Sequence, residues 1–330
     1  MERSKVKKFF EPKIIVSRCL GFEHCRYDGQ IISSEEVQEL KEHVDFMTIC
    51  PECDIGLGVP RDSLRLISDD GEIRLVQPET GRDVTDEMKD FLDDLLSEKQ
   101  DVDGFLLKSR SPSCGLKEVK IYSSVEGHAP EGQSAGIFGS MVLDRFPEKA
   151  IESEGRLRNH TIRQHFLTKI FTFANFRDIK RSEDIDRLGR FHENNRLLFR
   201  SYDEGSYRLM GDIYSKDEEV SEIFDLYEDA LHDLFRSPAG CESRIKIMED
   251  IYEEIKDGIG KEEKELFQDS LKDYNEGKTS LDVPLSILHS WLMRFEEEDM
   301  KNQSFFYPYP RDLVRLEDVK TCISKDYWYF

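Results

Sequence analysis

No stretch of this 330-residue sequence is apolar for long enough to span a membrane, since a spanning helix needs about 20 consecutive apolar residues. The first ten residues, MERSKVKKFF, also lack the apolar core of a secretory signal peptide. We therefore expect a cytoplasmic protein without a membrane partner. The chain is long for one domain, so two hydrophobic cores are expected.

Cysteine is scarce and does not follow the pattern of a disulfide-bonded protein. The seven cysteines are odd in number and irregularly spaced in a long chain. Disulfide frameworks are typical of short secreted domains with regular cysteine spacing. The cysteines that are present therefore indicate metal binding or catalysis.

Positive charge is also in deficit. The chain has 47 Lys and Arg against 69 Asp and Glu, a formal net charge of -22, which works against nucleic-acid binding. Between Gly155 and Met210 the balance is reversed, with 12 Lys and Arg against 7 Asp and Glu. This basic segment needs a separate explanation.

Strand-like and helix-like patterns alternate in the first half of the chain. Residues 13–17 (KIIVS), 44–49 (VDFMTI) and 104–108 (GFLLK) have the composition of buried strands, and amphipathic helical patterns lie between them. This alternation predicts a three-layer α/β domain with a mainly parallel sheet, which we assign to residues 1–150.

The second half has a different character. From about Glu152 onward no convincing strand pattern is present, and apolar residues recur every three to four positions, as at Ile162, Phe166 and Ile170. Residues 151–330 are therefore predicted to form an all-α domain, a helical bundle.

Three cysteines share one setting. Cys19, Cys50 and Cys114 each lie at or just beyond the end of a predicted strand. The carboxyl ends of neighbouring parallel strands open onto one crevice, where open α/β sheets bind their ligands. We therefore expect the three thiols to converge.

The cysteines allow more than one kind of site. Cys19, Cys25, Cys50 and Cys53 together could form a structural zinc site, although only the second pair has a common zinc spacing and Cys114 would remain unused. A thioredoxin-like role for the C-x-x-C pair needs a following helix, which nearby glycines disfavour. Three cysteines from distant loops suit an iron–sulfur cluster, whose fourth iron would stay open to a sulfur ligand.

Residues 13 to about 145 resemble the thiouracil desulfidase (TudS) family. The matching motifs are VSRCL (16–20), RYDG (26–29), CPE (50–52), GLGVPR (56–61), KSRSPSCG (108–115) and GIF (136–138). The second half resembles the helical domain of YbgA-type proteins, at RNH (158–160), FHENN (191–195) and YPYP (307–310). The two-domain arrangement resembles the tRNA 4-thiouridine desulfidases (RudS).

The resemblance implies a 4Fe–4S cluster with three cysteine ligands, Cys19, Cys50 and Cys114, and one open iron that binds the sulfur of a thiolated uracil. Cys25 and Cys53 stand where the family often has other residues, and we expect them not to be ligands. The implied reaction is hydrolytic and leaves the redox state unchanged.

Several residues near these motifs are candidates for roles in that reaction. Glu52, beside a predicted ligand, is the best candidate to take the proton of the attacking water. Ser109 and Ser111 are candidates to position the water or the uracil. The remaining candidates for substrate binding are Arg26, Tyr27, Arg61, Arg110 and Ser113.

The basic segment then becomes a candidate tRNA-binding face. Its representatives are Arg156, Arg158, Arg163, Arg177, Lys180 and Arg181. The alternative is that these side chains pair with the acidic surplus.

Three functions remain open on the sequence. The first is a desulfidase that converts 4-thiouridine to uridine in tRNA and releases sulfide. The second is the same chemistry on free thiouracil or thionucleosides. The third is a zinc-containing RNA-binding module without catalysis. The sequence does not predict the oligomeric state.

Overall fold

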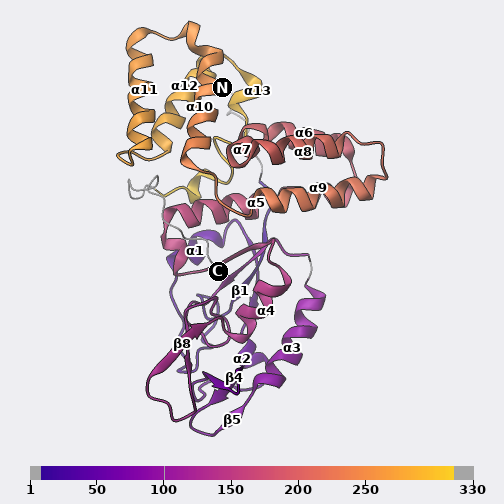
Figure 1. The fold of residues 1–330 in the computed structure, drawn as a ribbon, viewed down its shortest axis with the longest axis vertical. Coiled ribbons are helices and arrows are strands. Elements are labelled where there is room, and N and C mark those ends of the chain that lie inside the picture. Colours follow the sequence, from indigo (N-terminus) through magenta and orange to yellow (C-terminus); the bar gives the residue numbers. More distant parts are fainter. Residues whose placement is uncertain (1–8, 100, 316–330) are drawn as a thin grey trace. The chain divides into compact units, whose positions relative to one another are not determined.

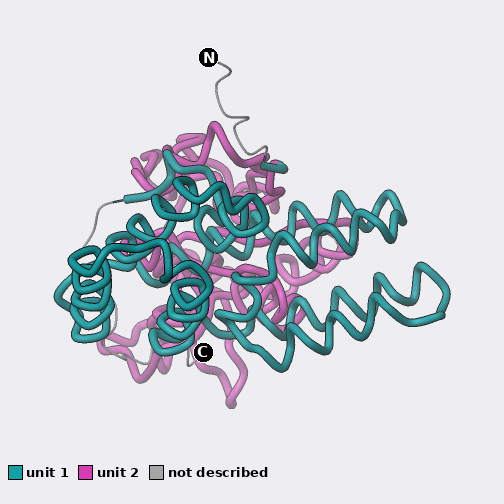
Figure 2. Tube along the Cα trace, turned by 90° about the horizontal axis from the view of Figure 1, so that it is seen from above, with its two compact units in different colours: residues 1–10, 160–329 teal, residues 11–159, 330 magenta. Residues whose placement is uncertain are grey.

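The computed structural model describes residues 9–99 and 101–315, which form two compact units. Residues 11–159 make up one unit, and residues 9–10 together with the chain from His160 onward make up the other (Figure 2). None of the helices in the described residues is both long and apolar enough to cross a membrane.

The first unit is built on a four-stranded parallel sheet. Its strands are β1 (Lys13–Ser17), β2 (Asp45–Ile49), β6 (Gly104–Leu107) and β9 (Ala150–Ser153), in the order β2-β1-β6-β9. All three pairings are parallel, which confirms the predicted α/β class. Ile14, Ile15 and Val16 are buried because β1 lies inside this sheet.

Strand β9 was not expected from the sequence. It has only two apolar residues, Ala150 and Ile151, before Glu152. Glu152 is nonetheless buried at this edge of the sheet because Arg156 donates two hydrogen bonds to its carboxylate, at 2.7 and 3.1 Å. A local ion pair therefore permits a strand that hydrophobic periodicity does not predict.

Helices connect the strands of this sheet. They are α1 (Glu35–Leu40), α2 (Pro51–Asp54), α3 (Thr85–Glu98) and α4 (Ile137–Arg145). Ser34 caps α1 by accepting a hydrogen bond from the backbone N–H of Val37. Met88, Leu92 and Leu96 form the buried stripe of α3.

A second, mixed sheet belongs to the same unit. Its strands are β3 (Arg65–Asp69), β4 (Glu72–Gln77), β5 (Arg82–Asp83), β7 (Val119–Tyr122) and β8 (Pro130–Ser134), in the order β5-β4-β3-β7-β8. All of its pairings are antiparallel except that of β3 with β7.

In the described residues of the second unit all regular elements are helices, as predicted (Figure 1). Its α-helices are α5 (His160–Ser182), α6 (Ile185–Asn194), α7 (Arg196–Tyr202), α8 (Glu204–Tyr214), α9 (Val220–Leu234), α10 (Cys241–Ile255), α11 (Lys261–Asn275), α12 (Asp282–Arg294) and α13 (Glu298–Lys301). Aromatic side chains fill much of its core; the ring of Phe176, for example, stacks on Tyr227 with 5.6 Å between centroids.

Helix α4 begins directly on the turn that carries Cys114. The backbone N–H of Gly136 donates to Gly115 O at 2.8 Å, and that of Phe138 donates to Ser113 O at 2.8 Å. A Cβ atom on Gly139 would overlap the carbonyl group of Gly115. The backbone hydrogen bonds at the start of α4 and the close contact of Gly139 therefore fix the position of the Cys114 turn.

We predict that Gly139→Ala destabilises the α/β unit by about 1–3 kcal/mol, because the added methyl group forces helix and turn apart. Hydrogen exchange of the β1 and β6 amides measures this loss, and the helical unit provides an internal reference. Gly132→Ala is the matched control, since no atom lies within 4 Å of its added Cβ. Equal protection in both variants would contradict the close contact.

Candidate functional site

A cavity of about 280 Å³ lies at the carboxyl ends of β1, β2 and β6. Its lining includes Cys19, Cys50 and Cys114, so the structure brings together the three cysteines that the sequence analysis singled out. The other predicted site residues that line it are Arg26, Tyr27, Glu52, Arg61, Ser109, Arg110 and Ser111. Cys25 lines the same cavity.

Each of the three cysteines is held by the element that precedes or follows it. Cys19 follows the end of β1, and Cys50 joins β2 to α2 as its N-cap residue. Cys114 lies in a turn closed by Ser111, whose hydroxyl oxygen accepts the backbone N–H of Ser113 at 3.3 Å and of Cys114 at 3.1 Å. The sheet therefore sets the spacing of the thiols, and local hydrogen bonds set their direction.

The buried thiols titrate above the ordinary range. The hydrogen bond with Cys19 contributes most to raising the pKa of Cys25 to about 12. A hydrogen bond with Cys25 and burial raise the pKa of Cys50, and burial raises the pKa of Cys114. Burial also raises the pKa of Cys53, to about 11. Without a metal these groups are neutral thiols, and metal binding would have to release their protons.

Among residues 9–99 and 101–315, no three His, Cys, Asp or Glu side chains are arranged to hold a single metal ion.

A buried ion pair ties the loops of the cavity together. Arg61 donates to Oε2 of Glu52 from Nη2 at 2.6 Å and from Nε at 2.9 Å. The two side chains are 4% and 13% exposed. On the other carboxylate oxygen, Glu52 accepts the hydroxyl of Ser113 at 2.8 Å. Glu52 thereby links α2 to the turn that carries Cys114.

Arg61 reaches a third loop from the same guanidinium. Its Nη1 donates to the carbonyl oxygens of Cys25 at 3.0 Å and Gly58 at 2.9 Å, and contacts Sγ of Cys53 at 3.4 Å. Burial works against the charge of Arg61, but the Glu52 carboxylate outweighs it, and the pKa of Arg61 is raised. With its donors engaged in this way, Arg61 acts as a structural centre of the site.

Glu154 is a site residue that the sequence analysis missed. It is 6% exposed and directly follows β9. Its carboxylate accepts the Ser109 hydroxyl at 2.8 Å, the Ser109 backbone N–H at 2.7 Å and Nζ of Lys108 at 2.6 Å. Lys108 also donates to the Ser109 hydroxyl oxygen at 3.0 Å. The signal for Glu154 would have been its place after a fourth parallel strand, which the hydrophobic periodicity of the sequence does not predict.

Three predicted substrate-binding residues are more exposed. The guanidinium of Arg26 lies 5.5 Å from the ring centroid of Tyr27 and 3.7 Å from the Asp28 carboxylate. Tyr27 is 44% exposed. The Arg110 side chain is 81% exposed and contacts Glu118 at 3.6 Å. These side chains are accessible to a ligand that enters the cavity.

The residues of the basic segment lie in different environments. Arg156 pairs with Glu152, as described above, and Lys180 pairs with Asp225 at 2.6 Å and Glu228 at 2.5 Å. Arg163 is 3% exposed and donates to the carbonyl oxygen of Leu313 at 3.3 Å.

Arg158 and Arg181 are exposed, and Arg177 is half-buried. The six residues therefore do not form one uniformly exposed face, and their predicted role in tRNA binding remains a prediction.

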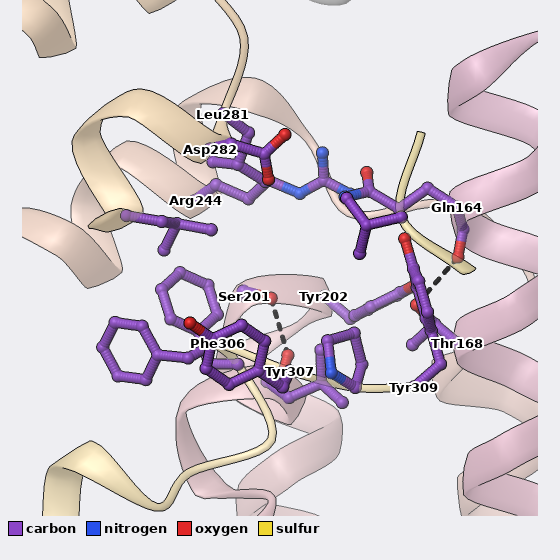
Figure 3. A pocket seen from close by; sticks show the side chains of 15 residues that line it. Gln164, Thr168, Ser201, Tyr202, Arg244, Leu281, Asp282, Phe306, Tyr307 and Tyr309 are labelled. Atoms are coloured by element: carbon purple, nitrogen blue, oxygen red, sulfur yellow. Dashed lines mark hydrogen bonds between the residues drawn. The ribbon is translucent and has the colours of Figure 1, made fainter. Parts of the chain in front are cut away.

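The helical unit has a smaller cavity of its own, of about 50 Å³ (Figure 3). Tyr202, Arg244 and Tyr309 are among the side chains around it, together with Asp282. The Thr168 and Ser201 hydroxyls near it donate to carbonyl oxygens of their own helices. This volume is far below that of the cysteine-lined cavity.

Comparison with known proteins gives two matching families. A family model described as 2-thiouracil desulfurase matches residues 14–154, and a model of a protein of unknown function, DUF1722, matches residues 196–310. The uncharacterized protein YbbK of Bacillus subtilis (strain 168) is 32% identical over 109 residues, which are 31% of this chain and 72% of YbbK. The solved structure of the 4Fe–4S-dependent thiouracil desulfidase TudS is 32% identical and matches 45% of this chain and 94% of its own, with a TM-score of 0.34.

We predict that Arg61→Met destabilises the α/β unit by about 3–5 kcal/mol, because it leaves the Glu52 carboxylate buried without its cation. The double variant Arg61→Met, Glu52→Gln should recover most of this loss, because no buried charge then remains. Hydrogen exchange of the β1 amides gives the four free energies of the cycle.

The control is Arg82→Met, which removes a pair with Glu87 whose side chains are 48% and 46% exposed, and which should cost at most about 1 kcal/mol. If Arg61→Met costs no more than this control, the pair does not hold the site together.

Proposed function

This chain belongs, through residues 14–154, to the 2-thiouracil desulfurase family, and we propose that it is an iron–sulfur-dependent desulfidase that removes sulfur from thiolated uracil. The observation that carries this proposal is the convergence of Cys19, Cys50 and Cys114, from three separate strand ends, on one cavity. Three thiols on independent loops are a donor set for an iron–sulfur cluster.

The cavity fits such a group in donor chemistry. Thiolates are the usual ligands of iron–sulfur clusters, and buried thiols lose their protons when they bind metal. A cluster is several atoms across, so its ligands lie farther apart than those of a single ion. When bound through Cys19, Cys50 and Cys114, a 4Fe–4S cluster would supply an open iron that polarises the carbon–sulfur bond of the substrate.

The side chains around the thiols have separate tasks in this proposal. Glu52 lines the cavity with a carboxylate that Arg61 and Ser113 hold in one orientation, and it takes the proton of the attacking water. The water oxygen forms a bond to the ring carbon, the carbon–sulfur bond breaks, and the sulfur leaves as sulfide. No electron is gained or lost overall.

Ser109 and Ser111 differ in whether their hydroxyl protons are available to the substrate or the water. The Ser109 hydroxyl donates its proton to Glu154, so it presents an acceptor to the substrate. The hydroxyl oxygen of Ser111 accepts two backbone N–H groups, and its proton is not held by a carboxylate. We therefore assign hydrogen-bond donation to the uracil edge or the water to Ser111. Tyr27 and Arg110, which are exposed, are assigned contacts with the base and its attached sugar phosphate.

The more specific substrate that we propose is 4-thiouridine in tRNA. Exposed basic residues of the segment that begins at Gly155, among them Arg158 and Arg181, support contacts with a phosphate backbone. Pairing of Lys180 with carboxylates and burial of Arg163 favour the second candidate, free thiouracil or a thionucleoside. The two candidates share the chemistry and differ only in what carries the base.

We predict that Glu52→Gln retains iron and sulfide but lowers the desulfidation rate by about 10²–10⁴-fold, because the amide cannot take up the proton of water. The amide has the same shape and its oxygen can still accept from Arg61, but the Arg61 charge is left without its anion, so the rate is expressed per bound iron and sulfide. Sulfide release is measured under anaerobic conditions, with Glu87→Gln as the control on the surface of the same unit. Full activity of Glu52→Gln would remove Glu52 from the reaction.

We also predict that the protein desulfurates 4-thiouridine in tRNA with a higher kcat/KM than free 4-thiouracil, and that its affinity for tRNA falls steeply with added salt. The variant Arg158→Ala, Arg181→Ala should reduce the slope of log affinity against log salt by about 2, one for each lost phosphate contact. Lys261→Ala, whose side chain is 89% exposed on α11, is the control. Salt-independent affinity, or a preference for the free base, would select the second candidate.

A further inference from the structure

Four thiols, and not only the three of the proposed cluster site, line the main cavity. Cys25 lies in the loop between β1 and α1 and contributes to the lining together with Cys19, Cys50 and Cys114. Cys53 is close to Cys50 in the chain, but it is absent from the lining of the cavity. The fold therefore separates the two additional cysteines into one that faces the cavity and one that does not.

The backbone of Cys25 is held firmly. Its carbonyl oxygen accepts Nη1 of Arg61 at 3.0 Å and is contacted by the thiols of Cys50 at 3.7 Å and Cys53 at 3.6 Å. Arg61 is itself fixed by its ion pair with Glu52. The position of Cys25 therefore depends on the same interactions that place Cys50 and the Cys114 turn.

The side chain of Cys25 is directed at the proposed ligands. The residue is 3% exposed, and it lines the cavity together with Cys19, Cys50 and Cys114. The Cys53 side chain lies outside this lining and is contacted by Arg61 at 3.4 Å. A buried cysteine that shares one cavity with the three proposed ligands is placed to act as a fourth.

We propose that Cys25 is a fourth, displaceable cysteine ligand, which occupies the open iron of the cluster when substrate is absent. Four cysteines are the complete ligand set of a 4Fe–4S cluster. The inference rests on the proposed function, because it requires that a cluster is bound by Cys19, Cys50 and Cys114. It adds that the resting site is closed and that thiolated uracil opens it.

The exchange is a ligand substitution without electron transfer. On binding, the Cys25 thiol would give its proton to solvent. On displacement by the sulfur of the substrate, the Cys25 thiolate would take a proton back from solvent. A closed site protects the iron from loss and from solvent. Because only open sites bind substrate, the apparent affinity for substrate is reduced in proportion to the fraction of sites that are closed.

The test compares Cys25→Val with the matched control Cys53→Val in the full-length, cluster-loaded protein. Each protein is treated anaerobically with a mild oxidant, and the loss of one iron is followed by electron paramagnetic resonance of the resulting three-iron cluster and by iron analysis. We expect Cys25→Val to lose this iron about tenfold faster than the wild type or more, by analogy with the loss of a supporting ligand. Cys53→Val should behave as the wild type.

A second variant and a second readout keep the outcomes distinct. Cys25→Ser keeps the size of the side chain and supplies a weaker, oxygen donor. Its rate of iron loss should therefore lie between those of the wild type and Cys25→Val. The KM for thiouracil should fall in Cys25→Val with little change in kcat, because the competing ligand is gone. Equal rates of iron loss in wild type and Cys25→Val would overturn the inference while leaving the desulfidase intact. A wild-type protein without iron and sulfide would instead overturn the proposed function.

Discussion

The buried pair of Arg61 and Glu52 is the interaction on which the candidate site depends. The parallel sheet brings three strand ends together, but the cysteines lie on the loops beyond those ends and need a further constraint. Arg61 holds the carbonyl of Cys25, while Glu52 holds the hydroxyl of Ser113. One ion pair therefore joins the loops of Cys25, Cys50 and Cys114. Because both side chains are largely removed from water, neither can lose its partner without leaving a buried charge.

A second carboxylate, Glu154, holds Ser109 and Lys108 in place by hydrogen bonds, as Glu52 holds the Cys114 turn. Both glutamates follow strands of the parallel sheet, and each accepts a serine hydroxyl and a cationic side chain. The cavity is thus built from paired charges around neutral thiols. Such a lining suits the polar ring of a thiolated uracil, which needs directional hydrogen bonds. It also leaves the thiols free to bind the proposed iron–sulfur cluster.

Much of the fold could be predicted from the sequence, because it depends on local patterns. Apolar runs located β1, β2 and β6, and helical periodicity identified the second half as all-α. Convergence of the cysteines followed from parallel topology. Strand β9 and Glu154 could not be found in this way, because burial of Glu152 depends on a pair with Arg156. The link between Arg61 and Cys25 spans 36 residues and exists only in the folded chain. Burial of Arg163 likewise depends on its contact with Leu313, 150 residues away.

The most direct test of the central claim is the iron and acid-labile sulfide content of protein purified without oxygen. The measurement compares the wild type with Cys19→Ala, Cys50→Ala and Cys114→Ala. The account predicts a brown wild-type protein with about four irons and four sulfides, and a damaged or absent cluster in each variant. Zinc without sulfide in the wild type, or an unchanged cluster in any of the three variants, would contradict it.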